Sequence, residues 1–129
     1  MSMSEISRRR LATCHDDLVR VWTAVAEVAD VQIICGHRGQ ADQTAHYEAK
    51  LSQLPWPKSR HNTIPSTAVD AAPLKVSAKT GKRVIDWKDT AGFVRLAAVV
   101  RGIAADLGVK LEWGGDWKMR DYVHWQLPR

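Results

Sequence analysis

The sequence predicts an α+β fold in which helices pack on one small, mainly antiparallel sheet. In two long stretches, one near each end of the chain, apolar residues recur every three or four positions, as on one face of a helix. Between these stretches, the run from Val31 to Cys35 is rich in β-branched residues and is followed by a glycine, as strands often are. The chain has 129 residues, enough for one domain with one hydrophobic core.

Composition limits the class of protein further. Hydrophobic residues make up 45% and charged residues 26%, which is ordinary for a soluble globular protein. The net charge of +5 fits a polyanionic partner, such as nucleic acid, an anionic membrane or another charged polymer. We expect no stable membrane insertion, because no apolar run approaches about 20 residues. We also expect no secretory signal, because no apolar h-region follows the N-terminal Met1-Ser2-Met3-Ser4-Glu5. Cys14 and Cys35 match no disulfide framework or metal motif, so we expect two reduced, partly buried thiols.

The first predicted helix runs from near Ser7, which can cap it, to Ala29. Its expected apolar face comprises Leu11, Cys14, Leu18, Val21, Val25 and Val28. The β-branched run from Val31 to Cys35 then predicts a strand, which the following glycine ends. A second helix is predicted from Ala41 to Leu54. Its expected contacts include Ala45, Tyr47, Ala49 and Leu51.

The second half of the chain predicts a hairpin or loop, one long helix and two strands. The hairpin or loop spans Leu74 to Ile85 and contains the turn signal Thr80-Gly81. The helix spans Asp86 to Leu107, with a cap at Asp89 and a terminating glycine at position 108. Strands are predicted from Val109 to Trp113 and from Tyr122 to Leu127, on either side of a glycine-rich turn.

Two separated segments carry residues that suit a metal site. His61 and Asp70 belong to the first segment, and Asp121 and His124 to the second. Zinc accepts imidazole nitrogen and carboxylate oxygen, and three protein ligands leave one position open for water. A fourth group can then act as a base toward that water. The alternative is that these are ordinary hydrogen-bonded or solvated side chains, since no short-spacing zinc motif is present.

Arg38 follows the first predicted strand, beside glycines, where it can project into a cleft. A guanidinium can bind a substrate carboxylate with two hydrogen bonds, or stabilise a developing oxyanion. The alternative is a surface salt bridge, which usually contributes little to stability.

The motifs together resemble a known family. Ser59-x-His61, Ala68-x-Asp70 and Asp121-x-x-His124-Trp125 are similar to the motifs of the zinc peptidases of bacterial cell walls. That family contains D-alanyl-D-alanine carboxypeptidases and dipeptidases, and a phage branch of L-alanyl-D-glutamate peptidases that serve as endolysins. Further similarity comes from Gly36-x-Arg38 with Gln43, and from the segment Trp113-Gly114-Gly115-Asp116-Trp117.

The resemblance implies a role for each site residue. His61, Asp70 and His124 would bind Zn²⁺, and Asp121 would be the catalytic base. Arg38 would help to stabilise the oxyanion and to bind substrate, and Ser59 would hold the substrate backbone.

Departures from the family pattern favour the phage branch. Eight residues separate His61 from Asp70, more than in the bacterial carboxypeptidases, and the usual glycine of that loop is absent. Pro65-Ser66 stands there instead, as in some phage members. His37 replaces the common tyrosine. The base is aspartate, as in the phage branch, where the dipeptidases use glutamate.

We therefore expect a single peptidase domain, 1–129, without a separate wall-binding domain. It would be a monomer that cleaves the L-alanyl-D-glutamate bond of bacterial peptidoglycan and binds no nucleic acid. It would be made in the cytoplasm of the host bacterium and would reach the wall during lysis. The alternatives are a D-alanyl-D-alanine carboxypeptidase of the same family and a non-catalytic basic or zinc-binding module.

Overall fold

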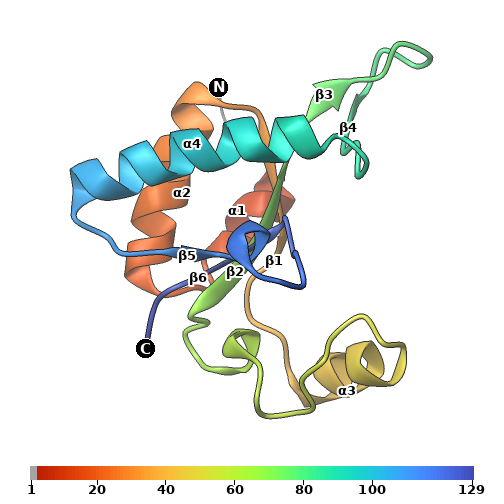
Figure 1. Cartoon of the computed structure of the whole chain (residues 1–129), viewed down its shortest axis with the longest axis vertical. Helices are drawn as coiled ribbons and strands as arrows, with labels where there is room; N and C mark the ends of the chain where they lie inside the picture. The colour runs from red at the N-terminus through yellow and green to blue at the C-terminus, as the bar shows by residue number, and fades with distance from the viewer. Residues whose placement is uncertain (1–2) are drawn as a thin grey trace.

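A four-stranded antiparallel sheet forms the centre of the molecule (Figure 1). A computed structural model describes residues 3–129, and the order of the strands across the sheet is β1-β2-β6-β5. These strands are β1 (Val31–Cys35), β2 (Ala68–Pro73), β5 (Glu112–Trp113) and β6 (His124–Gln126). The predicted α+β class, with helices on a small antiparallel sheet, is confirmed.

Two long helices, α2 (Asp16–Val28) and α4 (Thr90–Leu107), pack together and form the core with the sheet. The Trp22 ring of α2 meets the Trp125 ring of β6 edge to face, with ring centroids 6.2 Å apart. Trp125 in turn stacks on Trp113 at 5.6 Å. These large apolar contacts fix β5 and β6 against the helices, which leaves the other face of the strands for polar residues.

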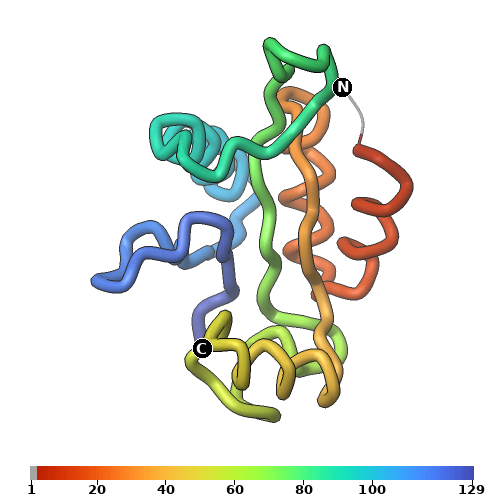
Figure 2. Tube along the Cα trace, turned by 90° about the vertical axis from the view of Figure 1, so that its right-hand side faces the viewer, coloured from red at the N-terminus to blue at the C-terminus, as the bar shows by residue number. Residues whose placement is uncertain are grey.

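The prediction of one helix from Ser7 to Ala29 is wrong, because two helices occupy this stretch. Ser4 caps α1 (Glu5–Leu11), which lies along β1 (Figure 2). Ser7 is buried inside α1, and its hydroxyl accepts a hydrogen bond from the backbone N–H of Ile33. A short break follows α1, and His15 then caps α2.

The apolar face predicted for this stretch is buried except at Val28, which is 61% exposed. The apolar spacing continues through the break between the helices, so periodicity alone could not reveal it.

The second predicted helix is shorter than expected and turns a different face inward. α3 (Gln40–Glu48) stands with its flanking loop apart from the sheet, beyond the end of β1 (Figure 1). All four of its expected apolar contacts, Ala45, Tyr47, Ala49 and Leu51, are exposed. Gln43 is the buried residue of α3.

The remaining elements follow the predictions with shorter bounds. The predicted hairpin is present as β3 (Lys75–Val76) and β4 (Arg83–Val84). Asp89 caps α4 as predicted, and Gly108 ends it with a left-handed backbone, φ 72°. Strands β5 and β6 are each a few residues shorter than predicted. In the described part of the chain, no helix is long and apolar enough to span a membrane.

A close backbone approach at Gly114 places the segment that leads into β6. Gly114 begins η2 (Gly114–Asp116), a short 3₁₀ turn, and its carbonyl accepts a hydrogen bond from Asp121 N–H at 2.9 Å. A Cβ atom on residue 114 would clash with the Asp121 carbonyl oxygen and lie 3.2 Å from the His124 Cβ. Only glycine therefore lets η2 lie directly against this segment.

We predict that Gly114→Ala destabilises the protein by about 1–3 kcal/mol, the usual cost of overpacking. Urea denaturation measures this change. Gly102→Ala is the matched control, because an added Cβ in the exposed middle of α4 meets no atom within 4 Å. The control should gain about 0.5–1 kcal/mol from the higher helix propensity of alanine. Equal stability of Gly114→Ala and the wild type would contradict the proposed packing constraint.

Candidate metal centre and active site

Three potential ligands lie in a row across the sheet. Asp70, in the middle of β2, is paired with Cys35 on β1 and with His124 on β6. Residues directly opposite each other on neighbouring strands project to the same face of a sheet. Trp125, the next residue after His124, projects to the other face and enters the core. The sheet therefore separates an apolar face, covered by helices, from a face that carries these donors.

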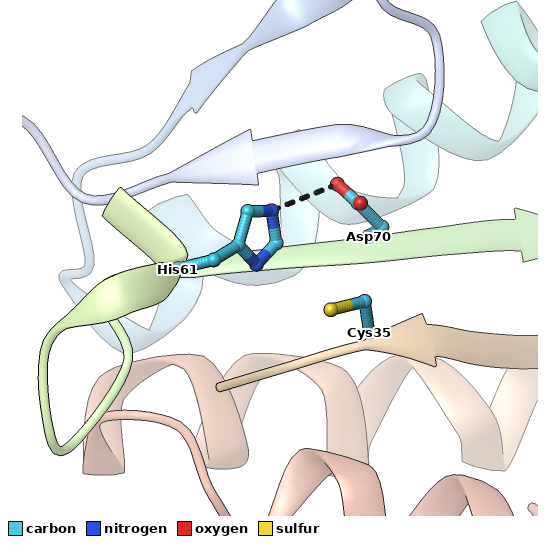
Figure 3. Close-up of side chains that lie close together, drawn as sticks. All are labelled: Cys35, His61 and Asp70. Atoms are coloured by element: carbon cyan, nitrogen blue, oxygen red, sulfur yellow. Dashed lines mark hydrogen bonds and ion pairs between the residues drawn. The ribbon is translucent and has the colours of Figure 1, made fainter. Parts of the chain in front are cut away.

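The fourth group, His61, comes from the loop that precedes β2. It lies in η1 (Arg60–Asn62), a short 3₁₀ turn in which the Ser59 hydroxyl accepts a hydrogen bond from His61 N–H. The His61 carbonyl accepts a hydrogen bond from Arg38 N–H at 2.7 Å, which ties η1 to the segment after β1. The His61 ring thus reaches Asp70, with its Nε2 atom 3.2 Å from Oδ1 (Figure 3).

The two imidazole rings are oriented by their outer nitrogens. His61 Nδ1 lies 2.7 Å from the Gly36 carbonyl oxygen, which can only accept, so Nδ1 carries the proton. His124 Nε2 lies 2.9 Å from Gln126 Oε1, and Gln126 in turn donates to Glu112. The inner nitrogens, Nε2 of His61 and Nδ1 of His124, both lie 3.2 Å from Oδ1 of Asp70. This is the arrangement of metal-binding histidines, whose outer nitrogens are held by hydrogen bonds.

The electrostatics of the cluster require positive charge beside Asp70. Burial acts to raise the pKa of the Asp70 carboxyl, but hydrogen bonds from His124 and His61 hold it well below its usual range. Burial acts to lower the pKa of His61, but hydrogen bonds to Asp70 and Cys35 raise it to about 10. A buried carboxylate of this kind needs a cation or proton donors around it, and a divalent metal ion meets that need.

The residues fit a zinc ion, and they include one potential ligand, Cys35, that the sequence analysis did not assign. Within residues 3–129, the three metal-ligating atoms that lie within 4.8 Å of one another belong to Cys35, His61 and Asp70. The predicted set has His124 in place of Cys35. Nitrogen, oxygen and sulfur donors of this kind are those that zinc prefers.

Asp121 lies near the cluster, and Ser59 caps the turn that carries His61. Burial, and then the negative charge of Asp70, raise the pKa of Asp121, whereas the charges of His124 and His61 lower it. The Asp121 carboxyl is therefore within electrostatic reach of all three predicted ligands. Ser59 is buried and caps the turn that carries His61. The structure thus gives Ser59 a local role, in addition to the predicted contact with substrate.

Arg38 is buried in the site and does not form the exposed salt bridge considered as its alternative role. It is 8% exposed, and its Nη2 atom lies 3.7 Å from Asp70 Oδ2. Its Nη1 atom donates to Gln43 Oε1 at 3.0 Å, and its Nε atom has no partner. The guanidinium is therefore held beside the candidate metal ligands and keeps one donor unused.

The Gln43 side chain makes four hydrogen bonds. The sequence analysis included Gln43 in a family motif but assigned no role to it. Its Oε1 atom accepts from Arg38 and from Asn62 at 3.0 and 3.1 Å. Its Nε2 atom donates to Ser52 Oγ and to the Leu54 carbonyl at 3.0 and 2.6 Å. Asn62 also donates to the Arg38 carbonyl. Gln43 thus joins α3 and its following loop to Arg38 and to the turn that carries His61.

The fold and this cluster define a protein with a candidate metal centre on one face of a small antiparallel sheet. The chain belongs to the phage L-alanyl-D-glutamate peptidase family, whose family model matches residues 1–127. It is therefore an L-alanyl-D-glutamate peptidase of the phage type, and family membership implies peptidoglycan as its substrate.

Two relatives agree with this assignment. The chain is 30% identical over 126 residues to the L-alanyl-D-glutamate peptidase of Escherichia phage T5. The matched region covers 95% of this chain and 86% of the phage T5 protein. Its structure is similar to the crystal structure of the Serratia marcescens L-Ala D-Glu endopeptidase ChiX. The TM-score is 0.81 at 29% identity, over 99% of this chain and 90% of the other.

We predict that Gln43→Met destabilises the protein by at least about 2 kcal/mol, since each buried group left unpaired costs about 1–3 kcal/mol. Urea denaturation measures this change. Gln40→Met, on the exposed first turn of α3, is the control and should stay within about 0.5 kcal/mol of the wild type. Equal effects of the two variants would show that the hydrogen bonds of Gln43 contribute little.

Proposed function

We propose that this chain is a zinc-dependent endopeptidase that acts as a phage endolysin, cleaving the L-alanyl-D-glutamate bond in the stem peptide of peptidoglycan. The observation that supports it best is the convergence of His61 and His124 on one oxygen of Asp70, with Asp121 beside them. In this proposal His61, Asp70 and His124 are the zinc ligands. Asp121 is the catalytic base and does not bind the metal.

The chemistry divides between the ion and the side chains. Zinc, when bound, supplies a Lewis acid that activates water and polarises the scissile carbonyl. Asp121 takes a proton from the attacking water and returns it to the leaving amine. Its raised pKa is suited to both steps, because a base works best when its pKa approaches the working pH. Arg38 supplies a fixed positive charge for the oxyanion.

Substrate contacts are proposed for two of these residues. The Nε atom of Arg38 is buried and has no hydrogen-bond partner, so we propose that the guanidinium turns outward to bind a carboxylate or carbonyl of the stem peptide. For Ser59, whose hydroxyl caps η1 beside His61, we propose a contact that holds the substrate backbone. The net charge of +5 favours approach to the anionic cell wall. We propose that residues 1–129 act as a monomeric peptidase domain, made in the host cytoplasm and brought to the wall during lysis.

The cleaved bond is tested by mass spectrometry of purified peptidoglycan after digestion. We expect peptides that begin with D-glutamate, together with glycan strands that retain L-alanine. Release of free D-alanine without such peptides would instead identify a D-alanyl-D-alanine carboxypeptidase. Salt-sensitive DNA binding without any cleavage would identify a basic binding module.

Removal of the metal should abolish wall lysis, and zinc should restore it. Binding should also raise the unfolding temperature, because the ligands come from distant segments that only the native fold brings together. Calorimetry with and without one equivalent of zinc measures this shift, and elemental analysis measures the remaining metal. Full activity of a metal-free sample would contradict a metallopeptidase.

Two alanine variants separate the base from the ligands. Asp121→Ala should retain zinc and fold but lose at least about 10²-fold in turnover, the lower range for general base catalysis. His124→Ala should lose zinc, because it removes one of three protein ligands. Zinc content and the rate of peptide cleavage are measured for both. Equal loss of zinc in the two variants would make Asp121 a ligand.

A further inference from the structure

We propose that Cys35 is an additional zinc ligand, which closes the metal site and holds the enzyme in a latent state until water displaces the sulfur. This inference rests on the proposed function, because it concerns the regulation of the same zinc site. The open site would hold zinc with His61, Asp70 and His124. In the closed site the thiolate of Cys35 would occupy the position that water needs.

A change of register in the sheet directs Cys35 to the site. Ile33 of β1 is paired with Ala71 of β2, but Cys35 is paired with Asp70. β1 therefore advances two residues while β2 advances one, as at a β-bulge. Without this shift, Ile34 would lie opposite Asp70 and Cys35 would project with Ile33 into the core. Bulges beside active sites commonly redirect a side chain in this way.

The sulfur lies among the predicted ligands. The Cys35 Sγ atom and the donor atoms of His61 and Asp70 all lie within 4.8 Å of one another. In Figure 3 the sulfur lies on the same side of the sheet as the His61 ring and the Asp70 carboxylate. Zinc binds thiolate at about 2.3 Å and imidazole or carboxylate at about 2.0–2.2 Å. A small movement of these side chains is therefore sufficient to bring all three onto one ion.

Four protein ligands would make the site inactive. Zinc sites with four protein ligands are typical of structural zinc, whereas catalytic sites keep one position for water. His124 lies outside the group of donors within 4.8 Å of one another, but its Nδ1 atom is 3.2 Å from the Asp70 oxygen that His61 also contacts. With His124 as the third proposed ligand, binding of Cys35 would complete a set of four. With no open position, Asp121 has no activated water to deprotonate.

Arg38 would stabilise the same closed state. Its Nη2 atom lies 3.7 Å from Cys35 Sγ and 3.7 Å from Asp70 Oδ2. The guanidinium thus places positive charge between the sulfur and the carboxylate, which suits a bound thiolate. While Arg38 makes these contacts, it is turned inward and is less available to the substrate. When Cys35 closes the metal site, its contact with Arg38 would therefore also hold this proposed substrate-binding residue away from the substrate.

Cys14, the other cysteine, provides a matched control within the chain. It is buried, its sulfur lies 3.7 Å from the Ala68 carbonyl oxygen, and burial raises its pKa to about 12. Such a thiol reacts slowly and does not bind metal readily. It belongs to none of the metal-ligating groups in the described residues.

The first test replaces zinc with cobalt and records the absorption spectrum. A thiolate ligand gives a sulfur-to-cobalt charge-transfer band in the near ultraviolet, which nitrogen and oxygen ligands do not. We expect this band in the wild type and in Cys14→Ala, and we expect Cys35→Ala to lack it. Absence of the band from cobalt-loaded wild type would overturn the inference.

The second test compares alkylation of the full chain by iodoacetamide with and without zinc. Zinc should slow modification of Cys35 at least about 10-fold, because a metal-bound thiolate is a poorer nucleophile than a free one. Cys14 should remain unmodified in both samples. Peptide mass spectrometry locates the label. Equal modification of Cys35 in the zinc-bound and zinc-free protein would also overturn the inference.

The third test separates a blocking ligand from a supporting one. At saturating zinc, Cys35→Ala should raise turnover about twofold or more, the gain expected if half of the wild type is latent. The zinc affinity of Cys35→Ala should fall at least about 10-fold, which is the loss seen when a hydrogen-bond partner of a metal ligand is removed. A fall in turnover with zinc fully bound would refute the latent state.

These outcomes can be told apart from failure of the proposed function. If His61→Ala and His124→Ala retain one equivalent of cobalt, the zinc site itself is wrongly placed. If those variants lose cobalt but the wild type has no charge-transfer band, the zinc site stands and only the role of Cys35 fails.

Discussion

The carboxylate of Asp70 is the constraint on which the site depends. It lies on β2, which pairs with β1 on one side and β6 on the other, and its side chain is 14% exposed. A carboxylate in such a position is costly to bury unless hydrogen bonds and positive charge surround it. His61, His124 and Arg38 supply both, each from a different segment of the chain. The buried Asp70 carboxylate is therefore stable only where three segments meet. These are the loop before β2, strand β6 and the segment after β1.

The rest of the fold makes that meeting rigid. The tryptophans of β5 and β6 pack against α2, so His124 projects from a strand whose other face is fixed in the core. His61 depends on polar contacts instead, since its turn is tied to Arg38 and, through Asn62, to Gln43. Apolar packing thus positions one imidazole and a buried hydrogen-bond network positions the other. Substitutions in either system should reach the site without touching a ligand.

The sequence was most informative where the physics is local. The periodicity of α4, its cap and its terminal glycine were all predicted, because each depends on residues within a few positions. The break between α1 and α2 was missed because the apolar spacing continues across it. The burial of Gln43 was not predicted, because its hydrogen-bond partners are distant in sequence. Two of them, Ser52 and Leu54, belong to a loop that covers Gln43 only in the folded protein. The motifs did locate the segments that meet at the site, because the resemblance supplied the long-range information that spacing lacks.

Cys35 shows the same limit most clearly. Simple alternation along β1 places it on the core side with Ile33, and nothing in the sequence announces the change of register. The consequence for the chemistry is a choice between affinity and turnover. A thiolate added to imidazole and carboxylate donors binds zinc more tightly, but it takes the position through which water must react. The shift in register brings the sulfur to the zinc site. A bound sulfur would raise the affinity for zinc and lower the fraction of enzyme that has a free position for water.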